Sequence, residues 1–198
     1  RASALSFALD AVAGISVDQD PGSWALTTDM SLRMRACPPP PRVSARSTVL
    51  REGRRSVTCK VELTAEDGAL VASGAVGFAR VPRKQGDPPK PAVTPELAPM
   101  VLRDLGTLER PVREEAGIQV VDAVEGAVQV EVTPALKNPA GTLQGAMVAL
   151  VAEAAAEDLI EARFGDPAVV VDLDLRYLGP ARDGLVRTRS RLLGDGPD

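Results

Sequence analysis

Two stretches of this 198-residue chain match each other at a single ungapped shift of 143 positions. Asp10 and Glu153 (153 − 10) are each the only charge in a long apolar run, ALSFALDAVAGI and AMVALVAEAAA. The same shift pairs further residues in chain order: Asp29 with Asp172, Leu32 with Leu175, Arg33 with Arg176, Val43 with Val186, Arg46 with Arg189, Ser47 with Ser190 and Gly53 with Gly196. Because the matches keep their order, they predict two copies of one structural unit.

The first copy has the pattern of a helix followed by antiparallel strands. Residues 2–16 are rich in Ala, Leu, Phe and Val and end in turn signals, which predicts a helix. Strands are predicted at Trp24–Arg35, Val43–Arg51, Ser56–Thr64 and Ala69–Val81. One face of the first strand is predicted to carry alternating residues: Leu26, Thr28, Met30, Leu32 and Met34. A helix followed by such a meander predicts the α+β class.

The second copy begins with a predicted hairpin, Gly117–Val124 and Ala127–Thr133, about Glu125-Gly126. The stretch Asn138–Leu159 follows, in which a turn-prone Asn-Pro-Ala-Gly and Gln144-Gly145 lead into a small-residue apolar helix that ends near Phe164. Strands are predicted at Ala168–Leu178 and Leu185–Leu193.

The domain plan therefore has three parts. Residues 1–82 form the first repeat, with its N-terminal strands missing, and residues 111–198 form the second, with its C-terminal strands missing. Residues 83–110 form a proline-rich linker with a short amphipathic piece at Met100–Leu105. A proline-rich ligand for a recognition module is the alternative reading of this segment. We expect the natural protein to extend at both ends; an internal gap is the other explanation.

Composition limits the partners. The net charge is −4 and the pI about 5.1, which argues against a general nucleic-acid binder. No apolar run reaches the length of about 20 residues that spans a bilayer, and Asp10 interrupts the N-terminal apolar region, which argues against a signal peptide. Cys37 and Cys59 fit a reduced, cytoplasmic interior better than a disulfide or a two-cysteine metal site.

The chain contains no histidine. Ser-His-Asp and Cys-His catalysis, His-ligated zinc and His-dependent dehydratase sites each lose a required group. Acid–base chemistry must therefore come from Asp, Glu, Lys, Tyr or bound water, and no metal is expected.

The second copy resembles the hotdog-fold acyl-CoA thioesterases, specifically the PaaI-like (phenylacetyl-CoA thioesterase) group. That family carries an Asn, a short loop, His-Gly-Gly and an acid nine positions after the His. Here Asn138 and Gly141 match, Gln144 replaces the His, Gly145-Ala146 replaces Gly-Gly, and Glu153 matches the acid. The strand AVVVDLDLRYLGPA, with Tyr177, also resembles the strand that follows the family's helix. The resemblance covers the second copy to its end and the first from its helix onward.

The resemblance implies a double hotdog: two central helices, each wrapped by an antiparallel sheet, with the sheets joined side by side. It also implies sites between the copies, with the loop and helix start of one facing the acid and a hydroxyl of the other. The first site would combine Asn138, Gln144 and Gly145 with Asp10 and Thr27. The second would combine Glu153 with an unseen loop, and there Val170 stands in the place of Thr27. We therefore expect the first site to be the better equipped.

The implied reaction is hydrolysis of acyl-CoA thioesters. The carboxylate would act as a general base on water or as a nucleophile, and the sequence leaves both open. Backbone N–H groups at the helix start would stabilise the oxyanion, and Gly145 would let the thioester approach them closely. Each residue also has a purely structural interpretation. Asp10 and Glu153 could be solvated or could cap a neighbouring group, and Asn138 and Gly141 could simply form a turn. Thr27 could simply favour the strand.

Two other functions remain open: a hotdog protein that binds acyl-CoA without cleaving it, and a structural unit whose apolar helices pack. No cofactor is expected beyond the coenzyme A of the substrate. The resemblance also implies that the tandem chain can pair into a homo-oligomer, and it leaves the acyl group undefined.

Overall fold

A computed structural model describes residues 1–35, 40–92 and 109–194. Cys37 and the predicted piece Met100–Leu105 lie outside these ranges. The first part of the chain comprises α1 (Ala2–Val17), β1 (Ser23–Met34), β2 (Ser44–Glu52), β3 (Ser56–Thr64) and β4 (Leu70–Pro82). The second comprises α3 (Val112–Glu115), β5 (Gln119–Asp122), β6 (Ala127–Glu131), the 3₁₀ turn η1 (Pro134–Leu136), α4 (Gly145–Phe164), β7 (Asp172–Arg176) and β8 (Leu185–Arg187).

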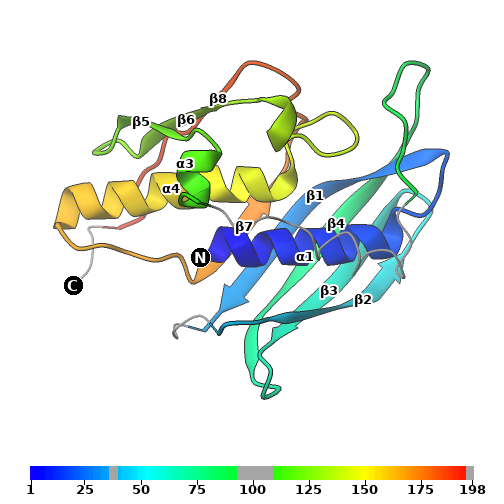
Figure 1. Cartoon of the computed structure of the whole chain (residues 1–198), viewed down its shortest axis with the longest axis horizontal. Coiled ribbons are helices and arrows are strands. Elements are labelled where there is room, and N and C mark those ends of the chain that lie inside the picture. The colour runs from blue at the N-terminus through cyan, green and yellow to red at the C-terminus, as the bar shows by residue number, and fades with distance from the viewer. Residues whose placement is uncertain (36–39, 93–108, 195–198) are drawn as a thin grey trace.

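Helix α1 lies across one face of a five-stranded antiparallel sheet whose strand order is β2-β3-β4-β1-β7 (Figure 1). Leu9 and Ala13 of α1 pack against a buried layer of the sheet that includes Met30, Val61 and Phe78. The predicted α+β class is confirmed, and the first helix and its four strands lie within two residues of their predicted bounds.

A β-bulge in β1 changes which residues face α1. The register with β4 shifts between Thr27 and Asp29, so Thr28 is an extra residue in the ladder. Ala25 and Thr27 face α1 before the bulge, whereas Met30 and Leu32 face it afterwards. The predicted single face is therefore right for Met30, Leu32 and Met34, but wrong for Leu26 and Thr28, because the bulge reverses the alternation.

Helix α4 packs on a second, three-stranded sheet of order β5-β6-β8. Val151 and Ala155 of α4 are buried against Val128 and Val130 of β6. The helix ends at Phe164 as predicted, because Gly165 takes the left-handed conformation (φ 83°) that terminates helices. The strands after it are shorter than predicted: β7 covers only Asp172–Arg176 and β8 only Leu185–Arg187.

The two parts of the chain meet at two places. Helices α1 and α4 lie side by side and run in opposite directions (Figure 1). Strand β7 joins β1 with Asp29 opposite Arg176 and Arg33 opposite Asp172. Two copies related by a local two-fold axis would form this reciprocal register, because Asp29 and Asp172 are equivalent under the 143-residue shift, as are Arg33 and Arg176. The repeat itself remains a prediction.

No helix in the described ranges is long and apolar enough to cross a membrane.

Candidate active site

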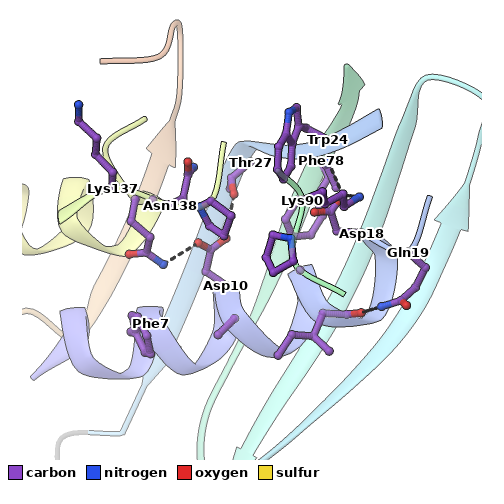
Figure 2. Close-up of a pocket in the computed structure, with 18 residues that line it drawn as sticks. Phe7, Asp10, Asp18, Gln19, Trp24, Thr27, Phe78, Lys90, Lys137 and Asn138 are labelled. Atoms are coloured by element: carbon purple, nitrogen blue, oxygen red, sulfur yellow. Dashed lines mark hydrogen bonds and ion pairs between the residues drawn. The ribbon is translucent and has the colours of Figure 1, made fainter. Parts of the chain in front are cut away.

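Asp10 lies in the middle of α1, on the side that faces the start of α4. Its side chain is almost fully enclosed, with 8% of the residue exposed. Thr27 donates its hydroxyl to Asp10 Oδ1 over 2.8 Å, and the amide of Gln144 donates to Oδ2 over 3.3 Å (Figure 2). Three residues from α1, β1 and the start of α4 therefore converge on one carboxylate.

The surroundings of Asp10 favour its neutral form more than water does. Burial raises the pKa of Asp10 above its ordinary value, and the hydrogen bond from Thr27 partly opposes that rise. A carboxylate with a raised pKa is a stronger base than an ordinary aspartate.

A tight turn before α4 fixes the position of Gln144. Asn138 and Thr142 bond to each other through both side chain and backbone: Asn138 Nδ2 donates to Thr142 Oγ1 over 2.9 Å, and Thr142 N donates to Asn138 Oδ1 over 3.1 Å. Gly141 inside this turn has φ 77°, which an L side chain rarely adopts. The side chain of Asn138 therefore has a structural role in stabilising this turn. Asn138 also lines both cavities described below.

Gln144 is the N-cap of α4 and serves two purposes with one amide. Its Oε1 accepts from Ala146 N over 3.1 Å, which satisfies one of the unpaired N–H groups at the helix start. That bond orients Nε2 toward Asp10. The helix start and the carboxylate are thus linked by one side chain.

Gly145, the first residue of α4, lies directly against the carboxylate. A Cβ at this position would be 3.0 Å from Asp10 Oδ2 and 3.5 Å from Tyr177 Oη, so a side chain would crowd the site. Within the described residues, the N–H of Gly145 has no hydrogen-bond partner. A free N–H at a helix start, beside a carboxylate, can bind a developing negative charge on a carbonyl oxygen.

Tyr177 was not among the predicted site residues, yet it lies beside this group. Its hydroxyl donates to the carbonyl oxygen of Gly145 over 3.0 Å. Burial, and after it the charge of Asp10, raise the pKa of Tyr177, so the phenol keeps its proton. The only feature of the sequence that pointed to Tyr177 was its place in the strand after the helix. A hydrogen bond to a backbone carbonyl depends on no particular partner residue, so the sequence could not predict it.

Two cavities flank this group, and Thr27, Asn138 and Gly145 line both of them. The first cavity, of about 340 Å³, follows α1 away from Asp10. The second, of about 390 Å³, lies on the other side of Thr27, against the segment that follows β7. Both fall within the size range of small-ligand sites, about 300–1,000 Å³. A two-armed ligand could therefore place its central atoms at Asp10.

Comparison with known proteins identifies the architecture. No protein-family model matches the sequence, and no curated protein matches it significantly. Among solved structures, an acyl-ACP thioesterase from Bacteroides thetaiotaomicron superposes with a TM-score of 0.53 at 13% identity, over 92% of this chain and 74% of that one. A tesB protein from Mycobacterium avium subsp. paratuberculosis superposes with a TM-score of 0.55 at 14% identity, over 90% of this chain and 68% of that one. The chain has the hotdog fold.

Similarities at this level of identity establish the hotdog fold and leave the activity to be tested. A shorter match, to a Bacillus halodurans protein solved with CoA, covers 41% of this chain and 55% of that one at a TM-score of 0.39. The chain thus spans just over half the length of that protein.

Within this hotdog fold, Asp10, Thr27, Gln144 and Gly145 come together as one group, and Asn138 shapes the turn beside them. Glu153 lies elsewhere. It is 1% exposed, and its carboxylate accepts from Ala2 N over 2.7 Å, from Ser3 N over 3.3 Å and from the Ser3 hydroxyl. It does not line either cavity described here. Its catalytic role remains a prediction, while its contacts are those of a cap on α1.

No cluster of three or more metal-ligating side chains occurs in the described part of the chain.

Proposed function

We propose that this protein hydrolyses acyl-CoA thioesters, with Asp10 as the general base. One observation carries the proposal: a buried carboxylate, held by Thr27 and Gln144, lies beside Gly145, whose N–H has no partner among the described residues, and Gly145 lines both cavities. The similarity of the fold to solved thioesterases supports the same reaction class.

The proposed reaction consumes one water molecule. Asp10 takes a proton from water as the water oxygen attacks the thioester carbonyl carbon, and the carbonyl oxygen becomes an oxyanion bound by Gly145 N–H. The carbon–sulfur bond then breaks, and the proton held by Asp10 passes to the thiolate that leaves. The products are a carboxylic acid and free CoA, with no cofactor consumed.

Thr27 and Gln144 are proposed to position the base. Each donates a hydrogen bond to one oxygen of Asp10, so the carboxylate cannot rotate freely. The same two hydrogen bonds make the oxygens of Asp10 weaker nucleophiles toward the thioester carbon. This favours attack by water over an anhydride intermediate. Gln144 itself cannot transfer a proton, so the proton must travel through Asp10.

The site lies between the two parts of the chain, which fits a tandem arrangement. We propose that residues 1–82 and 111–198 are two hotdog repeats, with α1 contributing the base and α4 the oxyanion donor. In this arrangement the equivalent carboxylate of the second repeat, Glu153, holds the start of α1. A cytoplasmic location and further pairing into a homo-oligomer remain part of the proposal.

The direct test monitors thiol release from acetyl-, hexanoyl-, decanoyl-, palmitoyl- and phenylacetyl-CoA. We expect release from at least one of them. A protein that binds acyl-CoA saturably but releases no thiol would be a binding protein, the second candidate, which the absence of a proton-carrying group at Gln144 favours. Neither binding nor release would indicate a structural role.

A further inference from the structure

The end of the first cavity is built by a segment that the sequence assigned to the linker. Residues 83–92, called the strap here, leave β4 and return over the fold. Lys90 and Pro91 of the strap line the first cavity together with Trp24 of β1 (Figure 2). Pro88 of the strap lies against the turn before α4, about 3.6 Å from where a Cβ of Gly141 would be.

Lys90 is locked in place. Its side chain is 9% exposed, and its ammonium donates to Asp18 Oδ1 over 2.7 Å, to Asp20 O over 2.7 Å and to Ser23 O over 2.8 Å. All three of its donors are therefore used, and its charge is paired with Asp18. Such a group forms a wall and has no hydrogen bond left for a ligand.

Trp24 completes the same wall. The residue is 5% exposed, and two cations lie over its ring, with Arg83 Cζ 5.2 Å and Lys90 Nζ 5.5 Å from the ring centroid. Stacking of this kind holds an aromatic ring rigidly. It is also the only tryptophan in the chain, so its fluorescence reports on this wall alone.

The floor of the cavity is one stripe of α1 that begins at Phe7, passes Asp10 and continues through Ala11, Gly14 and Ile15 to Asp18. With a rise of about 1.5 Å per residue, the Asp18 end lies about 12 Å from Asp10 along the helix. A Cβ at Gly14 would meet nothing within 4 Å, so this glycine leaves the middle of the cavity open. The remaining walls combine apolar residues such as Phe78 and Ala25 with the polar side chains of Gln19 and Lys137.

The two cavities differ at their outer ends. At the Asp18 end of the first cavity, Trp24 and the side chain of Lys90 are buried, with Gln19 exposed beside them, whereas the second cavity includes Leu178, which is 98% exposed. The thiol arm of a CoA thioester must reach solvent, because the nucleotide it carries is large and charged. The second cavity therefore suits the thiol arm, and the first suits the acyl group.

We propose that the first cavity is an acyl pocket of fixed length that selects straight, medium-length aliphatic acyl groups. Gly14 keeps it open, and the wall of Trp24 and Lys90 limits the chain. This inference rests on the proposed thioesterase function. A terminal carboxylate on the acyl group is disfavoured, because the charge of Lys90 is already paired with Asp18 and all three donors of its ammonium are used.

The kinetic test compares kcat/KM for acetyl-, hexanoyl-, decanoyl- and palmitoyl-CoA between variants. Gly14→Leu should lower the decanoyl-to-acetyl ratio by about tenfold or more, since a blocked hydrophobic pocket costs that much. Gly14→Ala is the matched control: it also favours the helix, but adds one methyl and should change the ratio far less. Lys90→Ala should raise kcat/KM for palmitoyl-CoA relative to decanoyl-CoA, because it opens the end wall.

A second measurement needs no turnover. Non-hydrolysable thioether analogues of the same acyl-CoAs are titrated while Trp24 fluorescence is followed. Short chains should bind without changing the fluorescence, and chains long enough to reach the wall should change it. Unaltered chain-length profiles in Gly14→Leu and Lys90→Ala, or a Trp24 response independent of chain length, would overturn the inference. If the protein released no thiol at all, the proposed function would fail, and the Trp24 titration would still decide the pocket.

Discussion

At the scale of single residues, the proposed chemistry depends on the hydrogen bonds and the burial that hold Asp10. Burial raises the pKa of Asp10 and makes it a better base, while the Thr27 hydrogen bond prevents that rise from going further. These opposing effects set the pH at which the base becomes ionised. Thr27 therefore tunes the pH range of the proposed reaction as well as the orientation of the carboxylate.

Thr27→Val should move the acidic limb of the kcat/KM profile to higher pH. The hydrogen bond lowers the pKa of Asp10, so its loss raises that pKa, and more alkaline solution is needed to ionise the base. At neutral pH the activity should fall by about tenfold, the cost of one charge-assisted hydrogen bond. The measurement is kcat/KM for the best acyl-CoA substrate across the pH range.

Thr28→Val is the matched control for this experiment. Thr28 is the adjacent residue of the same strand, but its hydroxyl donates to Asp29 and not to Asp10. The acidic limb should keep its position in this variant. Equal shifts in both variants would show that the strand, and not the Thr27 hydroxyl, sets the pKa.

Residue patterns could predict part of this site. Asp10, Thr27, Gln144 and Gly145 were found through the repeat and the resemblance, because both assign equivalent positions along the chain. Tyr177 and Lys90 were missed, since each acts through bonds to backbone carbonyls that carry no residue signature. The predicted face of β1 was wrong before the bulge, because a one-residue insertion into a ladder leaves no mark in the alternation.

At the scale of elements, α1 and α4 each place a carboxylate at the start of the other. Glu153 of α4 accepts three hydrogen bonds from the first residues of α1, whose N-cap, Arg1, makes no capping bond from its side chain. Asp10 of α1 meets the side chain of Gln144 at the start of α4, and not a backbone N–H. The two acids are equivalent under the 143-residue shift, yet only Glu153 caps the other helix through backbone N–H groups.

The two acids should therefore respond oppositely to neutralisation. Asp10→Asn should raise the melting temperature by about 2–4 °C, or about 1 kcal/mol, because it removes a charge whose burial is unfavourable. Glu153→Gln should lower stability by about 1–3 kcal/mol, because it replaces an acceptor of three hydrogen bonds and removes a charge at a helix start. Thermal unfolding of both variants provides the comparison.

The pH dependence of the Asp10→Asn effect has a defined sign. The pKa of Asp10 is raised in the folded state, so protonation of Asp10 stabilises the folded wild type at low pH. The wild type loses this stabilisation as the pH rises through that pKa. The stability that Asp10→Asn gains relative to the wild type should thus increase with pH. The difference between the two proteins isolates Asp10 from Glu157, whose pKa is also raised by burial. A gain largest in acid would contradict the assignment.

At the scale of the whole molecule, the site exists only because distant segments meet. The proposed base comes from α1, the N-cap and proposed oxyanion donor from the start of α4, and the wall of the proposed acyl pocket from the strap. The helices and strands of the first part could be predicted because their hydrophobic periods and turn residues are strong. The packing of the strap could not, because its proline-rich composition resembles that of a free linker and its anchors, Arg83 and Lys90, bond mainly to backbone carbonyls.

The most direct test of this account is thiol release by the wild type, Asp10→Asn and Glu153→Gln, measured below the unfolding temperature of all three. General-base catalysis contributes about 10²–10⁴-fold, so Asp10→Asn should lose activity on that scale while remaining folded. Glu153→Gln should keep most of its activity, because Glu153 lies away from both cavities. Full activity in Asp10→Asn together with its loss in Glu153→Gln would contradict the assignment.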